Sequence, residues 1–300
     1  MTTGGRQGCL LSPLLFITAL DWIMRETTEG GRTGIQWTLL SMLYDLDFAY
    51  DLALLSYSIG QMRGKMQKLE DNSGRVGLTV NATKAMRVKT IGNAKPVSCR
   101  GVELEIVKDF TYLGSVISSS GGAEMDIEAR IGKAKAAFAQ LKPVWKARNI
   151  SLKTKLRIFE SNVLLYGCET WGLTQANIKK LQTFINARLR YILGIWWPRK
   201  VSNQDLLEIA GQERVEMTIR RRKWRWIGHT LRKPPESITR TALDWDPQGR
   251  RKRGRPRLSW KRGVRKDLTA ANTSWQEVKK IARDRGRWRS FTEALCSRTG

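Results

Sequence analysis

Residues 44–56 read YDLDFAYDLALLS, and this stretch predicts a β-hairpin. Short apolar runs flank a group of acidic residues, a pattern typical of short strands rather than of a helix. Two strands joined by a tight acidic turn explain it best. Asp51 follows the turn, whereas Asp45 and Asp47 precede it on a strand from which their side chains are expected to point elsewhere.

The segment before the hairpin predicts a helix. Ser12 can cap it, and Pro13 suits the first helical position because its missing N–H costs nothing there. The apolar run over residues 14–24 then predicts a largely buried helix. After the hairpin we expect a helix over residues 61–69, and short strands over residues 77–81 and 110–117.

The pattern becomes helical beyond a Ser- and Gly-rich loop at residues 118–122, where we place the first domain boundary. Apolar residues from 127 to 145 recur at steps of three and four, which puts them on one helix face. Ser151 and Thr174 can cap a second and a third helix. The sequence therefore predicts a small helical bundle.

The charge of the chain is strongly basic and unevenly distributed. It has 54 Lys and Arg against 27 Asp and Glu, a net charge of +27. Residues 1–150 hold 19 basic and 14 acidic residues, whereas residues 151–300 hold 35 and 13. A basic half of this size is typical of a polyanion binder, because each neutralised phosphate releases condensed counterions.

Other compositional features narrow the compartment and the kind of site. No segment reaches the roughly 18 uncharged apolar residues of a transmembrane helix, and no signal peptide is visible. We therefore expect an intracellular protein of the nucleus or cytoplasm, neither secreted nor transmembrane. The four cysteines are far apart and there is one histidine, His229, which excludes a zinc knuckle.

Four segments, in this order, resemble motifs of non-long-terminal-repeat (LINE-type) retrotransposon reverse transcriptases. GGRQGCLLSPLLF at residues 4–16 resembles motif B, YDLDFAYDLALLS motif C, GLTVNATK at 77–84 motif D, and FTYLGSVIS at 110–118 the primer grip. YGCETWGL at 166–173, RRRKWRWIGHTLR at 220–232 and GRPRLSWKRGVRKDL at 254–268 look like the thumb and tail of the RTE-like group.

The resemblance implies an α+β fold. Residues 1–118 would be a truncated reverse-transcriptase palm, built from a β-hairpin and helices. It would contain motifs B, C and D and the primer grip, which is motif E. Residues 119–200 would be a helical thumb-like region, and residues 201–300 a basic, Trp-rich, helical nucleic-acid-binding tail. Because such a palm lacks its upstream strands, we expect exposed apolar side chains in residues 1–120.

The resemblance also assigns roles to residues of the palm. Lys84 would stand near the leaving pyrophosphate. The residues that would position the incoming nucleotide and the template are Gly5, Arg6, Gln7 and Gly8. Those that would hold the primer terminus are Phe110, Tyr112, Leu113 and Gly114.

Two departures from the family pattern argue against polymerase activity. The family's Phe-Ala-Asp-Asp reads Phe48-Ala49-Tyr50-Asp51 here. Polymerisation uses two Mg²⁺ ions that require carboxylate oxygens, and a phenol with a pKa of about 10 stays protonated and binds them poorly. The sequence also begins at motif B, so the strand with the other metal-binding aspartate is not in it. We expect Asp51 to be a weak remnant ligand, with Mg²⁺ and dNTP used by the ancestral enzyme only.

The predicted partners are RNA, DNA or their hybrid. The basic residues expected to bind them lie in the last third of the chain: Arg220, Arg221, Arg222, Lys223, Lys252, Arg253, Arg255 and Arg257. The predicted function is a catalytically inactive remnant of an RNA-directed DNA polymerase that still binds nucleic acid. One alternative is a polymerase subunit completed by another polypeptide. Another is a non-enzymatic DNA-binding protein, because residues 252–257 contain the Gly-Arg-Pro core of an AT-hook.

Overall fold

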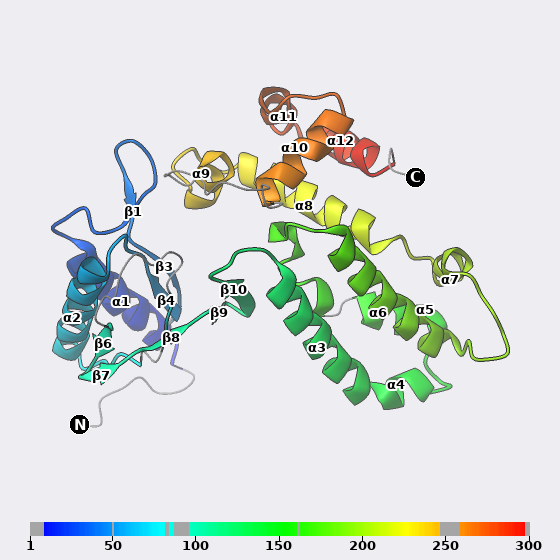
Figure 1. The fold of residues 1–300 in the computed structure, drawn as a ribbon, viewed down its shortest axis with the longest axis horizontal. Coiled ribbons are helices and arrows are strands. Elements are labelled where there is room, and N and C mark those ends of the chain that lie inside the picture. Colours follow the sequence, from blue (N-terminus) through cyan, green and yellow to red (C-terminus); the bar gives the residue numbers. More distant parts are fainter. Residues whose placement is uncertain are drawn as a thin grey trace. The chain divides into compact units, whose positions relative to one another are not determined.

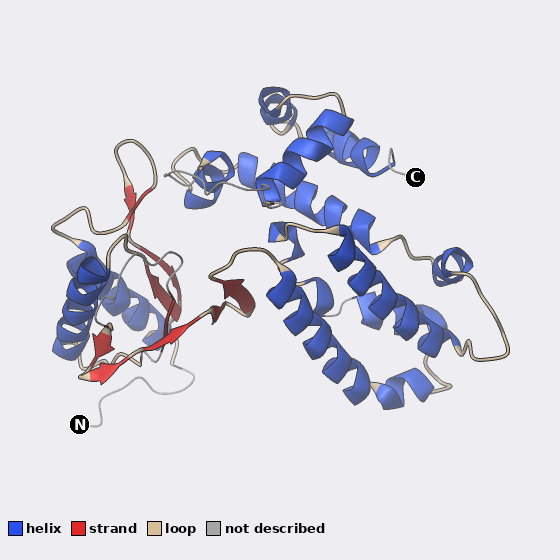
Figure 2. Cartoon of the chain, in the orientation of Figure 1, coloured by secondary structure: helices blue, strands red, loops and turns tan. Residues whose placement is uncertain are grey.

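The computed structural model describes residues 9–49, 51–81, 84–86, 96–160, 163–246 and 259–297. The chain forms two compact units, Met1–Gly114 and Ser115–Gly300. The first contains two long helices and several short strands, and the second is almost entirely helical (Figures 1 and 2). The sheets of the described residues are all two-stranded. The predicted boundaries at residues 118 and 200 stay predictions.

Two packed helices and a set of small sheets make up the first unit. The helices are α1 (Ser12–Thr28) and α2 (Ile59–Arg75). Its strands are β1 (Ile35–Gln36), β2 (Met42–Leu43), β3 (Asp45–Phe48), β4 (Asp51–Leu54), β5 (Lys84–Met86), β6 (Ser98–Cys99), β7 (Val102–Glu103), β8 (Glu105–Val107) and β9 (Asp109–Tyr112). A core of seven buried residues joins them: Ile23, Met24, Met66, Leu69, Val97, Cys99 and Leu104.

The predicted hairpin is confirmed. β3 and β4 pair antiparallel, with Asp45 opposite Leu54, Asp47 opposite Leu52, and Phe48 opposite Asp51. Side chains alternate between the two faces of a strand, and cross-strand partners share a face. Asp45 and Asp47 therefore lie on one face of the hairpin and Asp51 on the other, as the sequence indicated.

The helix α1 differs from its prediction in two ways. Its N-cap is Leu11, which makes no side-chain cap, and Ser12 is already helical. The helix is also buried only toward its carboxyl end, at Ile23, Met24 and Thr27. The exposed large apolar residues of its first half and the preceding turn are Leu10, Leu11, Leu14, Leu15, Phe16 and Ile17. The prediction of a largely buried helix is wrong, whereas the expectation of exposed apolar side chains in this region is confirmed.

The predicted strand at residues 77–81 is also wrong. Gly77 has a φ of +74°, and the amides of Gly77 and Leu78 bond back to the carbonyls of Gly74 and Ser73. These bonds cap the carboxyl end of α2, which a residue with positive φ commonly does. The strand begins later, at Lys84, and pairs parallel to β8.

The second unit contains the expected bundle. Its elements are β10 (Ser115–Ser118), α3 (Glu124–Gln140), α4 (Lys142–Lys146), α5 (Leu152–Glu160), the 3₁₀ turns η1 (Val163–Leu165) and η2 (Cys168–Thr170), α6 (Gln175–Leu193), α7 (Asn203–Ala210), α8 (Val215–Leu231), α9 (Ile238–Asp244), α10 (Trp260–Ala270), α11 (Trp275–Ile281) and α12 (Arg285–Ser297). Figure 1 shows α3 and α6 running side by side.

Local signals fix the ends of the bundle helices. Ser151 accepts a hydrogen bond from the amide of Thr154 at 3.2 Å, and Thr174 accepts one from Asn177 at 3.2 Å. Both predicted caps are confirmed. The helix predicted over residues 127–145 is instead broken after Gln140, and Pro143 stands in the first turn of α4. Proline removes an N–H that a continuous helix would need.

Helices α8 to α12 pack around tryptophan. Trp224 and Trp288 are buried, with ring centroids 6.1 Å apart. Asp267 of α10 accepts hydrogen bonds from Lys223 Nζ at 2.7 Å and from Trp224 Nε1 at 3.0 Å, which fastens α10 to α8. Two of the tryptophans that the sequence analysis assigned to a basic tail are therefore buried in the core of this part of the unit.

A lysine ties together the two ends of the stretch at residues 247–258, which lies outside the described residues. Lys261 Nζ donates to the carbonyl oxygen of Trp245 and, at 3.1 Å, to Asp246 Oδ1. The chain therefore leaves α9 and returns to α10 at nearly the same point.

Candidate nucleic-acid interface

The hairpin of the first unit holds an acidic group beside a buried lysine. Lys65 donates from Nζ to the carbonyl oxygens of Tyr44 at 2.9 Å and Leu55 at 2.7 Å. Burial lowers the pKa of Lys65. Burial raises the pKa of Asp45, and it raises that of Asp47 to about 6 with a contribution from the neighbouring Asp45. Although Asp47 is exposed, neighbouring protein atoms remove part of the hydration of its carboxyl group, and this loss of hydration is the main cause of the raised pKa.

The hairpin does not gather its carboxylates around one point. Asp51 lies on the opposite face from Asp45 and Asp47, because of the strand register. Among the described residues no group of three or more His, Cys, Asp or Glu is arranged to hold a metal ion. The strand register thus keeps Asp51 apart from the other two carboxylates of the hairpin.

The primer-grip segment does reach the hairpin. Tyr112 donates its hydroxyl hydrogen to the carbonyl oxygen of Leu46 in β3 at 2.9 Å. Phe110 is half-buried, and Leu113 and Gly114 both have positive φ, which makes the tight turn after β9. Two motifs more than 60 residues apart are thus joined by a hydrogen bond, and their roles with a primer stay predictions.

Several predicted site residues lie outside the described residues. These are Gly5, Arg6, Gln7, Gly8, Tyr50, Lys252, Arg253, Arg255 and Arg257. The backbone of Lys84 starts β5, in register with Glu105. Nothing in the structure tests their roles.

The basic run of α8 is engaged within the protein. Arg220 contacts Glu216 and Asp267, each at 3.5 Å, and Lys223 contacts Asp267 at 2.7 Å. Arg221 pairs with Glu213. Arg222 donates to the carbonyl oxygen of Leu165 at 3.2 Å. These contacts hold helices together, and a nucleic-acid role for the four residues stays a prediction.

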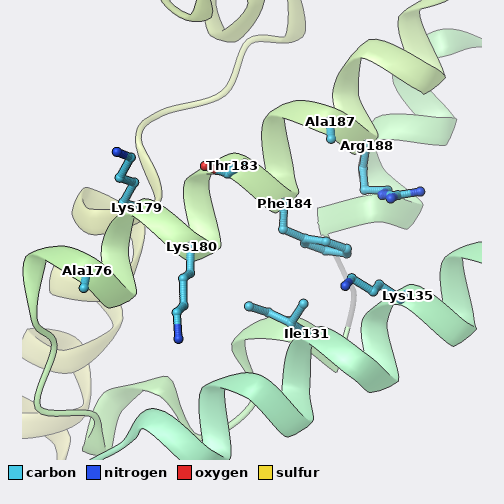
Figure 3. Close-up of a pocket in the computed structure, with 9 residues that line it drawn as sticks. All are labelled: Ile131, Lys135, Ala176, Lys179, Lys180, Thr183, Phe184, Ala187 and Arg188. Carbon is cyan, nitrogen blue, oxygen red and sulfur yellow. The ribbon is translucent and has the colours of Figure 1, made fainter.

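A basic groove lies between α3 and α6 (Figure 3). It has a volume of about 620 Å³ and an apolar floor that includes Ile131 and the buried ring of Phe184. Four cationic residues line it: Lys135, Lys179, Lys180 and Arg188.

The four cationic side chains differ in the contacts that they make within the protein. Lys180 Nζ bonds to Glu128 Oε1 at 2.7 Å, and this bond raises the pKa of Lys180. The guanidinium of Arg188 lies 5.0 Å from the ring centre of Phe138 and 5.4 Å from that of Phe184, which fixes it against the floor. Lys135 and Lys179 are exposed and make no ion pair with another described residue. Both line the groove, and their side chains come from different helices.

Helical spacing builds this groove. Lys180, Phe184 and Arg188 follow each other at steps of four along α6, so they share one face. Ile131 and Lys135 do the same on α3. These residues were not predicted from the sequence, because a search for consecutive basic residues passes over them. The signal that finds them is a mixture of basic and apolar residues at steps of four on each of the two helices.

Comparison with known proteins points to a mobile element. The chain is 26% identical over 265 residues to a protein of Caenorhabditis elegans named as an uncharacterized transposon-derived protein; the match covers 82% of this chain and 94% of the other. A family model described as a domain of unknown function (DUF6451) matches residues 137–166, from the end of α3 to the segment after η1. The similarity indicates a transposon-related origin. None of the helices in the described residues has the length and apolar character needed to cross a membrane.

Proposed function

We propose that the chain is a remnant of the RNA-directed DNA polymerase of an RTE-like non-long-terminal-repeat retrotransposon. It no longer polymerises DNA, and it binds RNA, DNA or their hybrid in the nucleus or cytoplasm. In this proposal the first unit is part of a reverse-transcriptase palm, and the bundle that begins with α3 is its thumb. The ordered motifs and the transposon-derived relative support this ancestry.

The groove between α3 and α6 is the observation that carries the proposed binding. Four cationic residues line it together with apolar residues, and two of the four have no acidic partner among the described residues. A phosphate backbone supplies the negative charge that such a surface attracts, and sugar and base surfaces can cover the apolar floor. The net charge of +27 adds long-range attraction.

The loss of polymerisation follows from Tyr50. A neutral phenol stands where the motif has a carboxylate, so it supplies no anionic oxygen to a divalent ion. Primer extension by the purified chain with Mg²⁺ or Mn²⁺ should therefore show no product. Extension by the wild-type chain would contradict this part of the proposal.

Charge reversal in the groove tests the binding. Lys135→Glu and Lys179→Glu should together lower the affinity for a labelled RNA–DNA hybrid at least tenfold in fluorescence anisotropy. They should also reduce the slope of log K against log salt by about 1 for each lost phosphate contact. Lys142→Glu together with Lys153→Glu, two reversals at exposed lysines of α4 and α5, is the control with the same change in net charge. An equal loss of affinity in the control and the groove variants would refute binding at the groove. Binding that does not depend on salt would refute the proposed nucleic-acid binding itself.

A further inference from the structure

The connection between α6 and α7 exposes two adjacent tryptophans. Trp196 is 59% exposed and Trp197 80% exposed, although most tryptophans of the second unit are buried or half-buried. Figure 1 shows this connection extending away from the helices that it joins. Large exposed aromatic side chains are costly in water and mark interaction surfaces.

Both ends of the connection are anchored. Gly194 ends α6 with a φ of +66°, and the amide of Ile195 bonds to the carbonyl of Arg190 at 2.9 Å. The side chain of Ile195 is buried in the core of the bundle. Arg190 Nη2 then donates to Val201 O and to Asn203 Oδ1, each at 3.0 Å, which binds the far end of the connection to α6. The tryptophans thus sit on a short, fixed support.

The exposed ring of Trp196 is held in place. The ring of Trp196 meets that of Tyr191 edge-to-face, with centroids 5.5 Å apart. The amide of Arg199 donates to the carbonyl of Trp196 at 2.9 Å, which closes a turn around the pair. A ring fixed in this way loses little conformational entropy when a partner stacks on it.

Cationic side chains stand next to the rings. Lys200 Nζ lies 5.5 Å from the ring centre of Trp197, and Arg199 is exposed beside it. No acidic residue occurs between Tyr191 and Gln204. Exposed aromatic faces next to positive charge complement a strand of unpaired bases, whose flat faces stack and whose phosphates are anionic.

We infer that Trp196 and Trp197 form a stacking platform for the unpaired bases of single-stranded nucleic acid, with Arg199 and Lys200 contacting its phosphates. The inference rests on the proposed function and specifies which form of nucleic acid this surface takes. A duplex is a poorer fit, because its bases already stack on each other and present only their edges.

The test compares single-stranded and duplex ligands of equal length on the full chain. Fluorescence anisotropy would use a labelled oligothymidylate of roughly 12 nucleotides and a mixed-sequence duplex. Trp196→Ala and Trp197→Ala should each weaken single-strand binding about tenfold and duplex binding less than twofold. Trp197→Phe, which keeps an aromatic face, should recover most of the loss. Ile209→Ala, at an exposed apolar residue of α7, is the matched control.

The outcomes separate this inference from the proposed function. Unchanged single-strand affinity in both tryptophan variants, with salt-dependent binding intact, overturns the stacking platform and leaves the proposed function standing. Equal losses for both ligands, or no recovery by Trp197→Phe, also overturn stacking. A wild-type chain that binds neither ligand overturns both. Circular dichroism should show the same melting temperature for all variants, since both rings are exposed.

Discussion

Gly228 lies where α8 packs against α12, and it has no room for a side chain. A Cβ atom there would stand 2.1 Å from Trp288 Nε1 and 2.3 Å from Cε2 of the same ring. Trp288 is buried, so its ring cannot move into solvent. Gly228→Ala should therefore lower the free energy of unfolding by about 2 kcal/mol, in the range typical of overpacked cores.

A second helical glycine is the control for this prediction. A Cβ atom added at Gly263, inside α10, would enter open space, with no neighbouring atom within 4 Å. Gly263→Ala should raise the free energy of unfolding by up to about 1 kcal/mol, because alanine is the better helix former. Urea denaturation followed by circular dichroism would measure both. Equal effects of the two substitutions would contradict the packing account.

Asp47 gives a prediction that depends on pH. Its pKa is about 6 in the folded protein against an ordinary value of 3.8, so the folded state binds the proton more tightly than the unfolded state. The contribution of Asp47 to stability is therefore highest below pH 4, falls between pH 4 and 6, and stays low above it. Asp47→Asn should raise the melting temperature at pH 7 by roughly 2 °C, a small value because the carboxylate keeps solvent access.

The same variant at acidic pH is its own control. At pH 4 the wild-type carboxyl is already largely protonated in the folded protein, so Asp47→Asn should leave the melting temperature nearly unchanged. Differential scanning calorimetry at the two pH values would measure this. A gain of equal size at pH 4 and pH 7 would show that relief of charge burial is not the cause.

Single residues also show where local sequence signals succeed. Ser151 and Thr174 cap their helices as predicted, because a hydroxyl before a helical run has few better partners than the free amides of the first turn. Ser12 carries the same signal but does not cap its helix. It is already the first helical residue, and Leu11, which has no side-chain acceptor, stands at the N-cap position.

At the scale of elements, Asp267 fastens α10 to α8. It is 8% exposed and faces Lys223, Trp224 and Arg220. Asp267→Ala should cost about 3 kcal/mol in the free energy of unfolding, because it leaves a half-buried cation and a buried indole N–H without their partner. Thermal and urea denaturation would measure the loss.

An exposed ion pair of the same unit is the comparison. Asp246 pairs with Lys261 at 3.1 Å, but its side chain is 63% exposed. Asp246→Ala should therefore cost less than about 1 kcal/mol. A loss as large as that for Asp267→Ala would mean that burial does not decide the strength of these pairs.

Elements were predictable where the periodic pattern alone determines them. The hairpin at Asp45–Leu54 and the helices α5 and α6 follow from alternation, period and caps. The groove between α3 and α6 did not follow, because its cations come from two helices more than 30 residues apart. The exposure of Trp196 and Trp197 likewise depends on how the bundle core captures Ile195. A palm identity for the first unit remains a proposal.

At the scale of the whole molecule, the two units should differ in stability. The first has a core of seven buried residues and an exposed apolar face on α1, whereas the second has three larger clusters. Amides in the first half of α1 should exchange with solvent hydrogen much faster than those of α6 and α8, since opening them exposes little new apolar surface. Hydrogen exchange with mass spectrometry would measure this. Equal protection of α1 and α6 would contradict it.

The hydrogen bonds of Lys261 hold together the two segments on either side of the arginine-rich stretch at residues 247–258. The folding of these segments should therefore depend little on the stretch itself. Because Lys261 already holds Trp245 and Asp246 beside the start of α10, each doubling of the intervening chain length should cost only about 0.6 kcal/mol in loop-closure entropy. An evolving element can thus exchange, lengthen or shed this stretch while the helices on either side stay folded. The composition of this stretch and the stability of the protein can therefore change independently of each other.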